Sequence, residues 1–198
     1  MLYALLKIIF QLLFRTIFRV RVIGAENLPQ QGPVILAANH MSNWDPPFLA
    51  CFMRRHVAYM AKEELFRPPV FGTAIRMCHA FPVKRGAADR AAIKTAVEIL
   101  KLGHCLGLFP EGTRSRTGKM HKAEAGVGLI AALTGAPVTP AAIIGTDRIF
   151  ANGGFLPKLT VIVGKPMHFT GDRRNKEALA AFSQSILDEI ARMKETVR

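Results

Sequence analysis

An unbroken apolar run, Val34-Ile35-Leu36-Ala37-Ala38, stands between the turn-forming pair Gly32-Pro33 and a polar stretch that begins at Asn39. An apolar run of this length bounded by turn residues predicts a short strand in the protein core. Asp45-Pro46-Pro47 then predicts a helix start, with the aspartate as the N-cap and proline in the first turn. The chain must therefore pass from a buried strand to a helix within a few polar residues.

His40 falls at the end of the predicted strand and Asp45 at the start of the predicted helix. Across such a corner the two side chains can meet. A carboxylate on one imidazole nitrogen fixes the tautomer and leaves the other nitrogen free to act as a general base. A histidine and an aspartate five residues apart are a weak signal by themselves, since Asp45 could be only an N-cap and His40 only a loop residue.

The rest of the chain alternates between strand and helix patterns. Strands are predicted at 19–24, 57–61, 81–83, 105–109, 138–144 and 159–163, and helices at about 46–54, 70–77, 87–102 and 123–134. A C-terminal helix is marked by the stripe Leu179, Phe182, Ile186, Ile190 and Met193. This order predicts an α/β fold, a single-domain sandwich with a largely parallel or mixed sheet flanked by helices. Active groups are expected on loops at strand ends.

Residues 1–19 are the most hydrophobic segment. Lys7, Gln11, Arg15 and Arg19 recur every four residues, which places them on one stripe of a helix whose other faces are apolar. The charges interrupt a membrane-spanning pattern. We expect an amphipathic membrane-interface helix over 1–19, with its cations reaching the headgroups, and a folded domain over 20–198. The alternative is a core helix of a soluble domain.

The chain carries 27 Lys and Arg against 14 Asp and Glu, a formal net charge of +13. Such a surface favours an anionic partner: nucleic acid, an anionic membrane or a phosphorylated substrate. With two Tyr, one Trp and no basic-aromatic interleaving, we expect no nucleic acid partner. Cys51, Cys78 and Cys105 are odd in number and widely spaced, which predicts reduced thiols in a cytoplasmic setting and no structural zinc.

A second constellation follows the strand at 105–109, where the chain reads Phe109-Pro110-Glu111-Gly112-Thr113-Arg114-Ser115-Arg116. Glycine lets the backbone approach a ligand closely, and arginine offers a planar fork to phosphate oxygens. Glu111 fits a phosphate site poorly by charge, but it could accept hydrogen bonds from a ligand hydroxyl or orient Arg114. Phe81-Pro82-Val83-Lys84-Arg85 presents cations at another strand end. The alternative is a solvated basic turn.

These blocks, together with Val138-Thr139-Pro140, occur in the order and spacing of the glycerolipid acyltransferases. From about Val22 to Pro166 the chain resembles the 1-acyl-sn-glycerol-3-phosphate acyltransferase family. The resemblance implies that His40 is the general base and Asp45 its partner. It also implies a substrate-binding set for the glycerol phosphate, consisting of Arg85, Glu111, Gly112, Thr113 and Arg114.

The implied reaction moves an acyl chain from a thioester, acyl-CoA or acyl carrier protein, to the sn-2 hydroxyl of lysophosphatidate and gives phosphatidate. No cofactor is implied, and the other histidines show no metal-ligand spacing. We expect a peripheral or monotopic protein on the cytoplasmic face of the cell membrane. The alternatives are another acceptor, glycerol 3-phosphate or a lyso-ornithine lipid, and a non-catalytic protein that binds lipid at the membrane surface.

Overall fold

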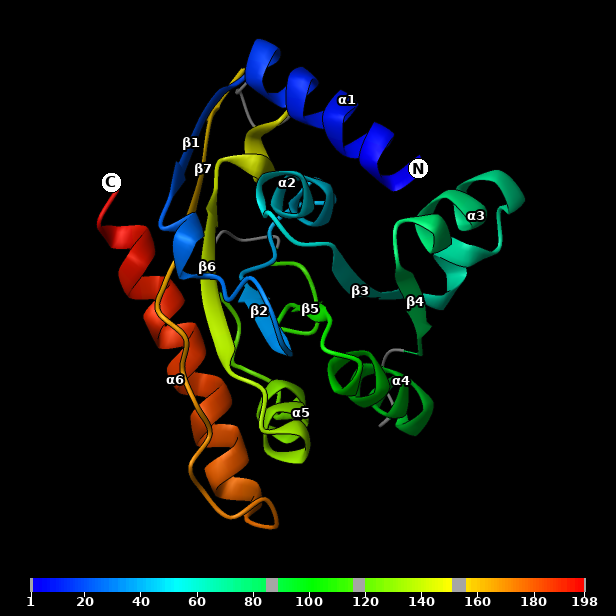
Figure 1. Ribbon diagram of the computed structural model, residues 1–198. Coiled ribbons are helices and arrows are strands. Elements are labelled where there is room, and N and C mark those ends of the chain that lie inside the picture. The colour runs from blue at the N-terminus through cyan, green and yellow to red at the C-terminus, as the bar shows by residue number, and fades with distance from the viewer. Residues whose placement is uncertain (1, 85–88, 116–119, 151–155, 198) are drawn as a thin grey trace.

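The protein is described by a computed structural model that covers residues 2–84, 89–115, 120–150 and 156–197. Across these residues one mixed sheet runs through the molecule in the order β1-β7-β6-β2-β5-β3-β4 (Figure 1). Strands β6 and β7 pair antiparallel, and the other neighbours in the sheet pair parallel. The strands are β1 (Arg19–Ile23), β2 (Val34–Ala38), β3 (Val57–Lys62), β4 (Ala80–Val83), β5 (Cys105–Leu108), β6 (Val138–Ile144) and β7 (Lys158–Val163).

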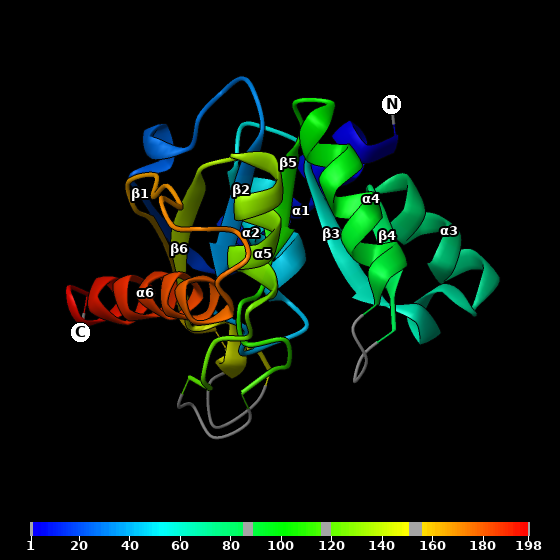
Figure 2. The same cartoon turned by 90° about the horizontal axis from the view of Figure 1, so that it is seen from below.

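Helices cover both faces of this sheet (Figures 1 and 2). Helices α1 (Leu2–Ile17) and α2 (Asp45–Phe52) pack on one face, and α4 (Arg90–Lys101), α5 (Gly126–Thr134) and α6 (Lys176–Glu195) pack on the other. Helix α3 (Pro69–Met77) stands beside the edge strand β4. The sandwich predicted from the alternating pattern is therefore confirmed.

Strand β2 shows why its sequence is apolar at every position. Val34, Leu36 and Ala38 contribute to the cluster under α1 and α2, while Ile35 and Ala37 contribute to the cluster under the opposite helices. All five side chains are fully buried. A strand between two helical layers has no solvent face, so the usual apolar–polar alternation is absent.

Two helix starts differ from their predictions. Helix α4 was expected from residue 87 and begins at Arg90, because the Asp89 carboxylate accepts a hydrogen bond from Ala92 N at 3.0 Å and caps the helix there. Helix α5 was expected from residue 123 and begins at Gly126. Ala123 and Glu124 have no regular secondary structure, and Ala125 holds the N-cap position.

The polar stripe of α1 faces the domain. Lys7 Nζ donates a hydrogen bond to Met53 O, and Gln11 Nε2 donates to Cys51 O at 2.5 Å. These carbonyls lie at the C-terminal end of α2, where the last C=O groups of a helix lack intrahelical partners. Arg15 lies over the Phe52 ring, 5.7 Å from its centroid. The prediction that the cations of this stripe reach lipid headgroups is therefore wrong for Lys7.

The apolar face of α1 is consequently turned outward, except at Tyr3 and Phe14, which are buried. The Phe14 ring is buried and lies 5.3 Å from the Phe48 ring in an edge-on contact. Helix α1 ends at Ile17, and the chain continues into β1 at Arg19. No helix in the ranges that the structure describes is long and apolar enough to cross a membrane. The exposed apolar residues of α1 are Leu5, Ile8, Ile9, Leu12, Leu13 and Ile17.

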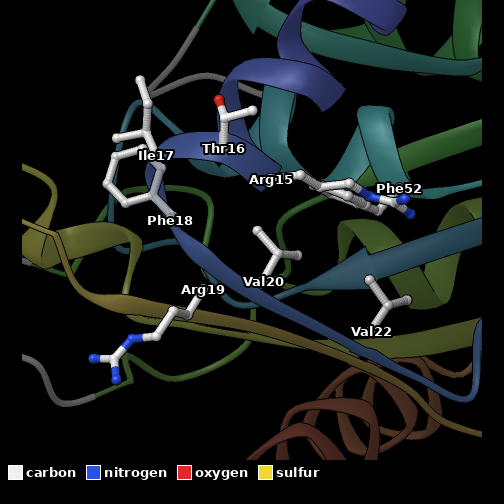
Figure 3. Close-up of a pocket in the computed structure, with 8 residues that line it drawn as sticks. All are labelled: Arg15, Thr16, Ile17, Phe18, Arg19, Val20, Val22 and Phe52. Atoms are coloured by element: carbon white, nitrogen blue, oxygen red, sulfur yellow. The ribbon is translucent and has the colours of Figure 1, made fainter.

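A cavity of about 570 Å³ lies where the end of α1 meets β1 and α2 (Figure 3). In Figure 3 the Arg15 side chain extends toward Phe52, and the Arg19 side chain extends away from it. None of the predicted site residues lines this cavity, which is therefore separate from the corner around His40. Its lining residues are Arg15, Thr16, Ile17, Phe18, Arg19, Val20, Val22 and Phe52.

Candidate active site

Three adjacent parallel strands end at the same edge of the sheet and carry the candidate site. His40 stands two residues beyond β2, and the loop 109–115 follows β5. Thr146 stands two residues beyond β6. Because β2 pairs parallel with both β5 and β6, the segments that follow these strands meet, although they are about 70 and 100 residues apart in sequence.

The pairing of His40 with Asp45 occurs as the corner predicted. His40 Nδ1 lies 2.9 Å from Asp45 Oδ2, and the two residues are 7% and 0% exposed. A carboxylate oxygen accepts, so Nδ1 donates, and the neutral ring then carries its lone pair on Nε2. The geometry supplies a histidine in one fixed tautomer with a basic nitrogen available for a substrate proton.

The prediction that Asp45 caps its own helix is wrong. Trp44 holds the N-cap position, and Asp45 is the first residue of α2. Its Oδ2 also accepts hydrogen bonds from Met41 N at 2.6 Å and Ser42 N at 2.7 Å. The carboxylate therefore closes the turn back toward His40. Phe48 N, from which an N-cap at Asp45 could have accepted, donates to Trp44 O at 2.9 Å instead.

Aromatic stacking fixes the plane of the His40 ring. The His40 and Phe109 rings lie 4.1 Å apart at an interplanar angle of 18°, and Tyr59 stacks behind Phe109 at 6.1 Å and 17°. The hydrogen bond from Nδ1 sets the direction in which the imidazole points, and stacking on Phe109 sets the orientation of the ring plane. Phe109 belongs to the motif read from the sequence, but no role for it follows from the sequence alone.

Glu111 holds two segments of backbone together. Its Oε1 accepts a hydrogen bond from His40 N and its Oε2 from His121 N, both at 2.9 Å, and the residue is 3% exposed. The loop closes from the other side as well, because Ser115 N donates to His40 O at 2.9 Å. Glu111 thus contacts the peptide of His40 itself. From the sequence it was expected to contact a ligand hydroxyl or to orient Arg114, and this partner was not anticipated.

The remaining motif residues lie on the same loop or outside the described ranges. Gly112 has φ +65°, a left-handed backbone conformation that favours glycine, and a Cβ there would lie 2.5 Å from Glu124 Oε1. Thr113 and Arg114 are exposed beyond this turn. Arg85, the other predicted phosphate ligand, lies outside the described residues.

Two positioning contacts were not anticipated. Asn39 is fully buried, and its amide pairs with both backbone groups of Ile143, donating to O at 2.9 Å and accepting from N at 2.7 Å. Thr146 Oγ1 donates to Asp45 Oδ1 at 2.5 Å. Asn39 thus extends the β2–β6 pairing by one side chain and fixes the backbone before His40. The position of Thr146, just after a strand of the predicted sheet, is the signal that could have identified it.

The cysteine thiols are unsuited to covalent catalysis. Burial raises the pKa of the Cys51 thiol to about 11 and that of Cys105 to about 12. Burial also raises the pKa of Cys78. A thiol with a raised pKa is protonated near neutral pH and is a poor nucleophile. A covalent intermediate on one of these three cysteines is therefore disfavoured.

Comparison with known proteins gives concordant matches. The profile of the family described as Acyltransferase matches residues 19–144. The chain is 33% identical over 177 residues to a 1-acyl-sn-glycerol-3-phosphate acyltransferase of Bacillus subtilis, covering 86% of both chains. An enzyme of the same name from Pseudomonas aeruginosa is 30% identical over 172 residues, 84% of this chain and 65% of that protein.

A solved structure matches the fold. The crystal structure of the 1-acyl-sn-glycerophosphate acyltransferase of Thermotoga maritima superposes with a TM-score of 0.75 at 29% sequence identity. The match covers 96% of this chain and 79% of that one.

Proposed function

Because this chain belongs to the 1-acyl-sn-glycerol-3-phosphate acyltransferase family, we propose that it transfers an acyl group from a thioester to the sn-2 hydroxyl of lysophosphatidate and forms phosphatidate. The observation that carries the proposal is the buried His40–Asp45 pair, joined through Glu111 to the loop of the second motif. The donor is acyl-CoA or acyl carrier protein. Relatives named as 1-acyl-sn-glycerol-3-phosphate acyltransferases support the lysophosphatidate acceptor.

In the proposed mechanism His40 Nε2 takes the proton of the acceptor hydroxyl as its oxygen attacks the thioester carbonyl carbon. The tetrahedral intermediate then collapses, and the C–S bond breaks. The imidazolium returns the proton to the departing sulfur, so the products are an ester and a free thiol. The thioester is already activated, and a covalent enzyme intermediate is not needed.

Asp45 and Glu111 act on this step through His40. Asp45 holds the tautomer and stabilises the imidazolium, and Thr146 together with two backbone N–H groups fixes the carboxylate. Glu111 fixes the peptide that carries the base. We therefore assign Glu111 to positioning, in place of the direct substrate contact that the family resemblance implied.

The phosphate of the acceptor is proposed to bind Arg114 and Arg85. Arg114 is exposed on the loop that Glu111 anchors to His40, which supports a phosphate site within reach of the base. Arg85 takes this role from the resemblance alone. Thr113 and Gly112 complete the proposed acceptor site, a role that they take from the family resemblance.

The function is tested by measuring thiol release from acyl-CoA and from acyl carrier protein with three acceptors in parallel. We expect release to depend on lysophosphatidate and to be weak with glycerol 3-phosphate or a lyso-ornithine lipid. Faster release with either of the other acceptors would assign the protein to that reaction. Absence of release with every pair of donor and acceptor would favour a non-catalytic lipid-binding protein.

Arg114→Ala is expected to raise the KM for lysophosphatidate by about tenfold or more, since a hydrogen bond to a charged group contributes roughly 1.5–3 kcal/mol. The donor KM and kcat should change much less. Steady-state kinetics with each substrate varied in turn measures the effect, and Arg173→Ala, which removes an exposed arginine before α6, is the matched control. A rise confined to the donor KM would assign Arg114 to the donor.

We also propose that α1 holds the protein on the membrane surface, with its exposed apolar face in the lipid and the net charge of +13 drawing it to anionic headgroups. Cytoplasmic-face attachment follows from the expected cytoplasmic setting. Because Phe14 lies in the core, deletion of residues 1–19 would damage the fold as well as the anchor.

Paired substitution on the exposed face of α1 is therefore the better test. Ile8→Gln together with Leu12→Gln should weaken binding to anionic vesicles by at least about tenfold, since burying one such side chain is favourable by roughly 1.5–3 kcal/mol. Vesicle flotation measures binding, and the melting temperature checks the fold. Unchanged flotation with an intact fold would move the anchor away from α1.

A further inference from the structure

The exposed apolar side chains of this protein are concentrated on two elements that are distant in sequence. Of the fourteen large ones found in the described residues, six lie on α1 and four lie within residues 65–77. The second group comprises Leu65 in the short 3₁₀ helix η2 (Glu63–Phe66) and three residues of α3. Those three are Val70, Phe71 and Met77.

Helix α3 is poorly covered by the rest of the domain. Among its residues only Gly72 is buried, where a Cβ would lie 2.4 Å from Phe66 O. Val70 is 84% exposed and Phe71 is 51% exposed. A short helix that leaves its largest apolar side chains in water loses most of the free energy that burial would supply. Apolar groups gathered in this way on a soluble surface indicate an interaction site.

This group lies close to the N-terminal end of α1. The Tyr3 ring near the start of α1 lies 5.4 Å from the His79 ring, which follows α3, and 4.2 Å from the His56 ring before β3. Figure 1 shows the N-terminal end of α1 and helix α3 beside each other. The start of α1 and this second group are therefore close in space, although about 60 residues separate them in sequence.

The charges around α3 favour a lipid surface as the occupant. Arg67 and Arg76 are exposed at either end of the helix, and the Arg76 guanidinium lies 5.0 Å from the centroid of the Phe66 ring. Of the two acidic residues in η2, Glu64 pairs with Lys62 at 3.2 Å. Apolar side chains flanked by arginines fit the surface of an anionic bilayer. The apolar groups can enter the acyl region, while the arginines reach the headgroups through their long apolar stems.

We propose that the surface formed by Leu65, Val70, Phe71 and Met77 is a second membrane-contacting site, which binds the bilayer together with α1. The proposal rests on the lipid acceptor of the proposed function. Two contacts on different elements fix the orientation of the domain on the bilayer, whereas α1 alone would leave it free to rotate about the helix axis. The sheet edge that carries His40 would then keep one orientation toward the lipid.

The test compares two double variants that remove equal numbers of exposed apolar side chains. Val70→Gln with Phe71→Gln changes α3. Leu102→Gln with Leu133→Gln changes the residue that follows α4 and a residue of α5, on the face of the sheet opposite α1. Leu102 is 73% exposed and Leu133 is 44% exposed. Flotation is measured with vesicles of phosphatidylglycerol and phosphatidylcholine, and the molecular mass in solution is measured without vesicles. Thiol release is measured with a soluble short-chain lysophosphatidate.

The proposal predicts that the α3 variant binds vesicles at least about tenfold more weakly than wild type, and that the control variant binds like wild type. Equal flotation of the α3 variant and wild type would overturn it. Loss of a dimer in solution, with flotation unchanged, would also overturn it by assigning the surface to a second copy of the chain. Thiol release on the soluble acceptor should survive in both variants, so loss of the proposed reaction is recognised separately from loss of membrane contact.

Discussion

Replacing His40 by alanine is expected to lower kcat by a factor on the order of 10² or more, the range for losing a general base. The reason is chemical, since an alcohol is a weak nucleophile until a base takes its proton as the C–O bond forms. The KM values should change little, because the ring acts on the hydroxyl in the transition state. Thiol release under saturating donor and acceptor measures the effect.

His168→Ala is the matched control, because it removes an exposed histidine outside the site and should leave kcat unchanged. The melting temperature of both variants shows whether the fold survives. A His40→Ala protein that is folded and nearly as active as wild type would remove His40 from the chemistry. An equal loss in the His168→Ala protein would point to a general effect of losing a histidine.

The second large effect is expected from Glu111→Gln. The amide retains one acceptor oxygen but places an NH₂ group against a backbone N–H, so either His40 N or His121 N loses its partner in a buried site. An unsatisfied buried donor costs about 1–3 kcal/mol, and displacement of the base by about 1 Å costs on the order of 10² in rate. We expect kcat to fall by about 10- to 100-fold, with a lower melting temperature and a nearly unchanged acceptor KM.

The split between kcat and KM distinguishes the two roles of Glu111. A residue that binds the glycerol phosphate would raise the acceptor KM on substitution, whereas a residue that positions His40 lowers kcat. Glu98→Gln, an exposed substitution on α4, controls for the loss of one negative charge. A large rise in acceptor KM with kcat retained would restore the substrate-binding role and contradict the positioning role.

The strand and the corner around His40 could be predicted because their signals are local. Five apolar residues followed by a polar turn and a Pro-Pro pair indicate a buried strand, a turn and a helix start. Parallel pairing then brings the end of β5 to the end of β2. The position of Asp45 at the start of α2 was predicted, but the N-cap role predicted for it is wrong. The partner that its carboxylate meets depends on which N–H groups the turn presents.

Other contacts could not be predicted because they depend on tertiary partners. The spacing of Lys7 and Gln11 correctly predicted one stripe of a helix, but it did not reveal which side meets the domain. The side that faces the domain is set by backbone carbonyls at the end of α2, which accept hydrogen bonds from Lys7 and Gln11 and lie 40 or more residues later in the sequence. Glu111 presented the same difficulty, since its charge argued against a phosphate contact but did not identify the peptide of His40 as its partner.

The central claim is that this protein joins an acyl group to the sn-2 oxygen of lysophosphatidate. Mass spectrometry of the lipid product tests it most directly, with purified protein, 1-acyl lysophosphatidate and a thioester whose acyl chain differs in length from that of the acceptor. The account predicts phosphatidate that carries the donor chain at sn-2, formed in step with free thiol and lost in the His40→Ala protein. Thiol release without a diacyl product, or the same product from the His40→Ala protein at the wild-type rate, would contradict it.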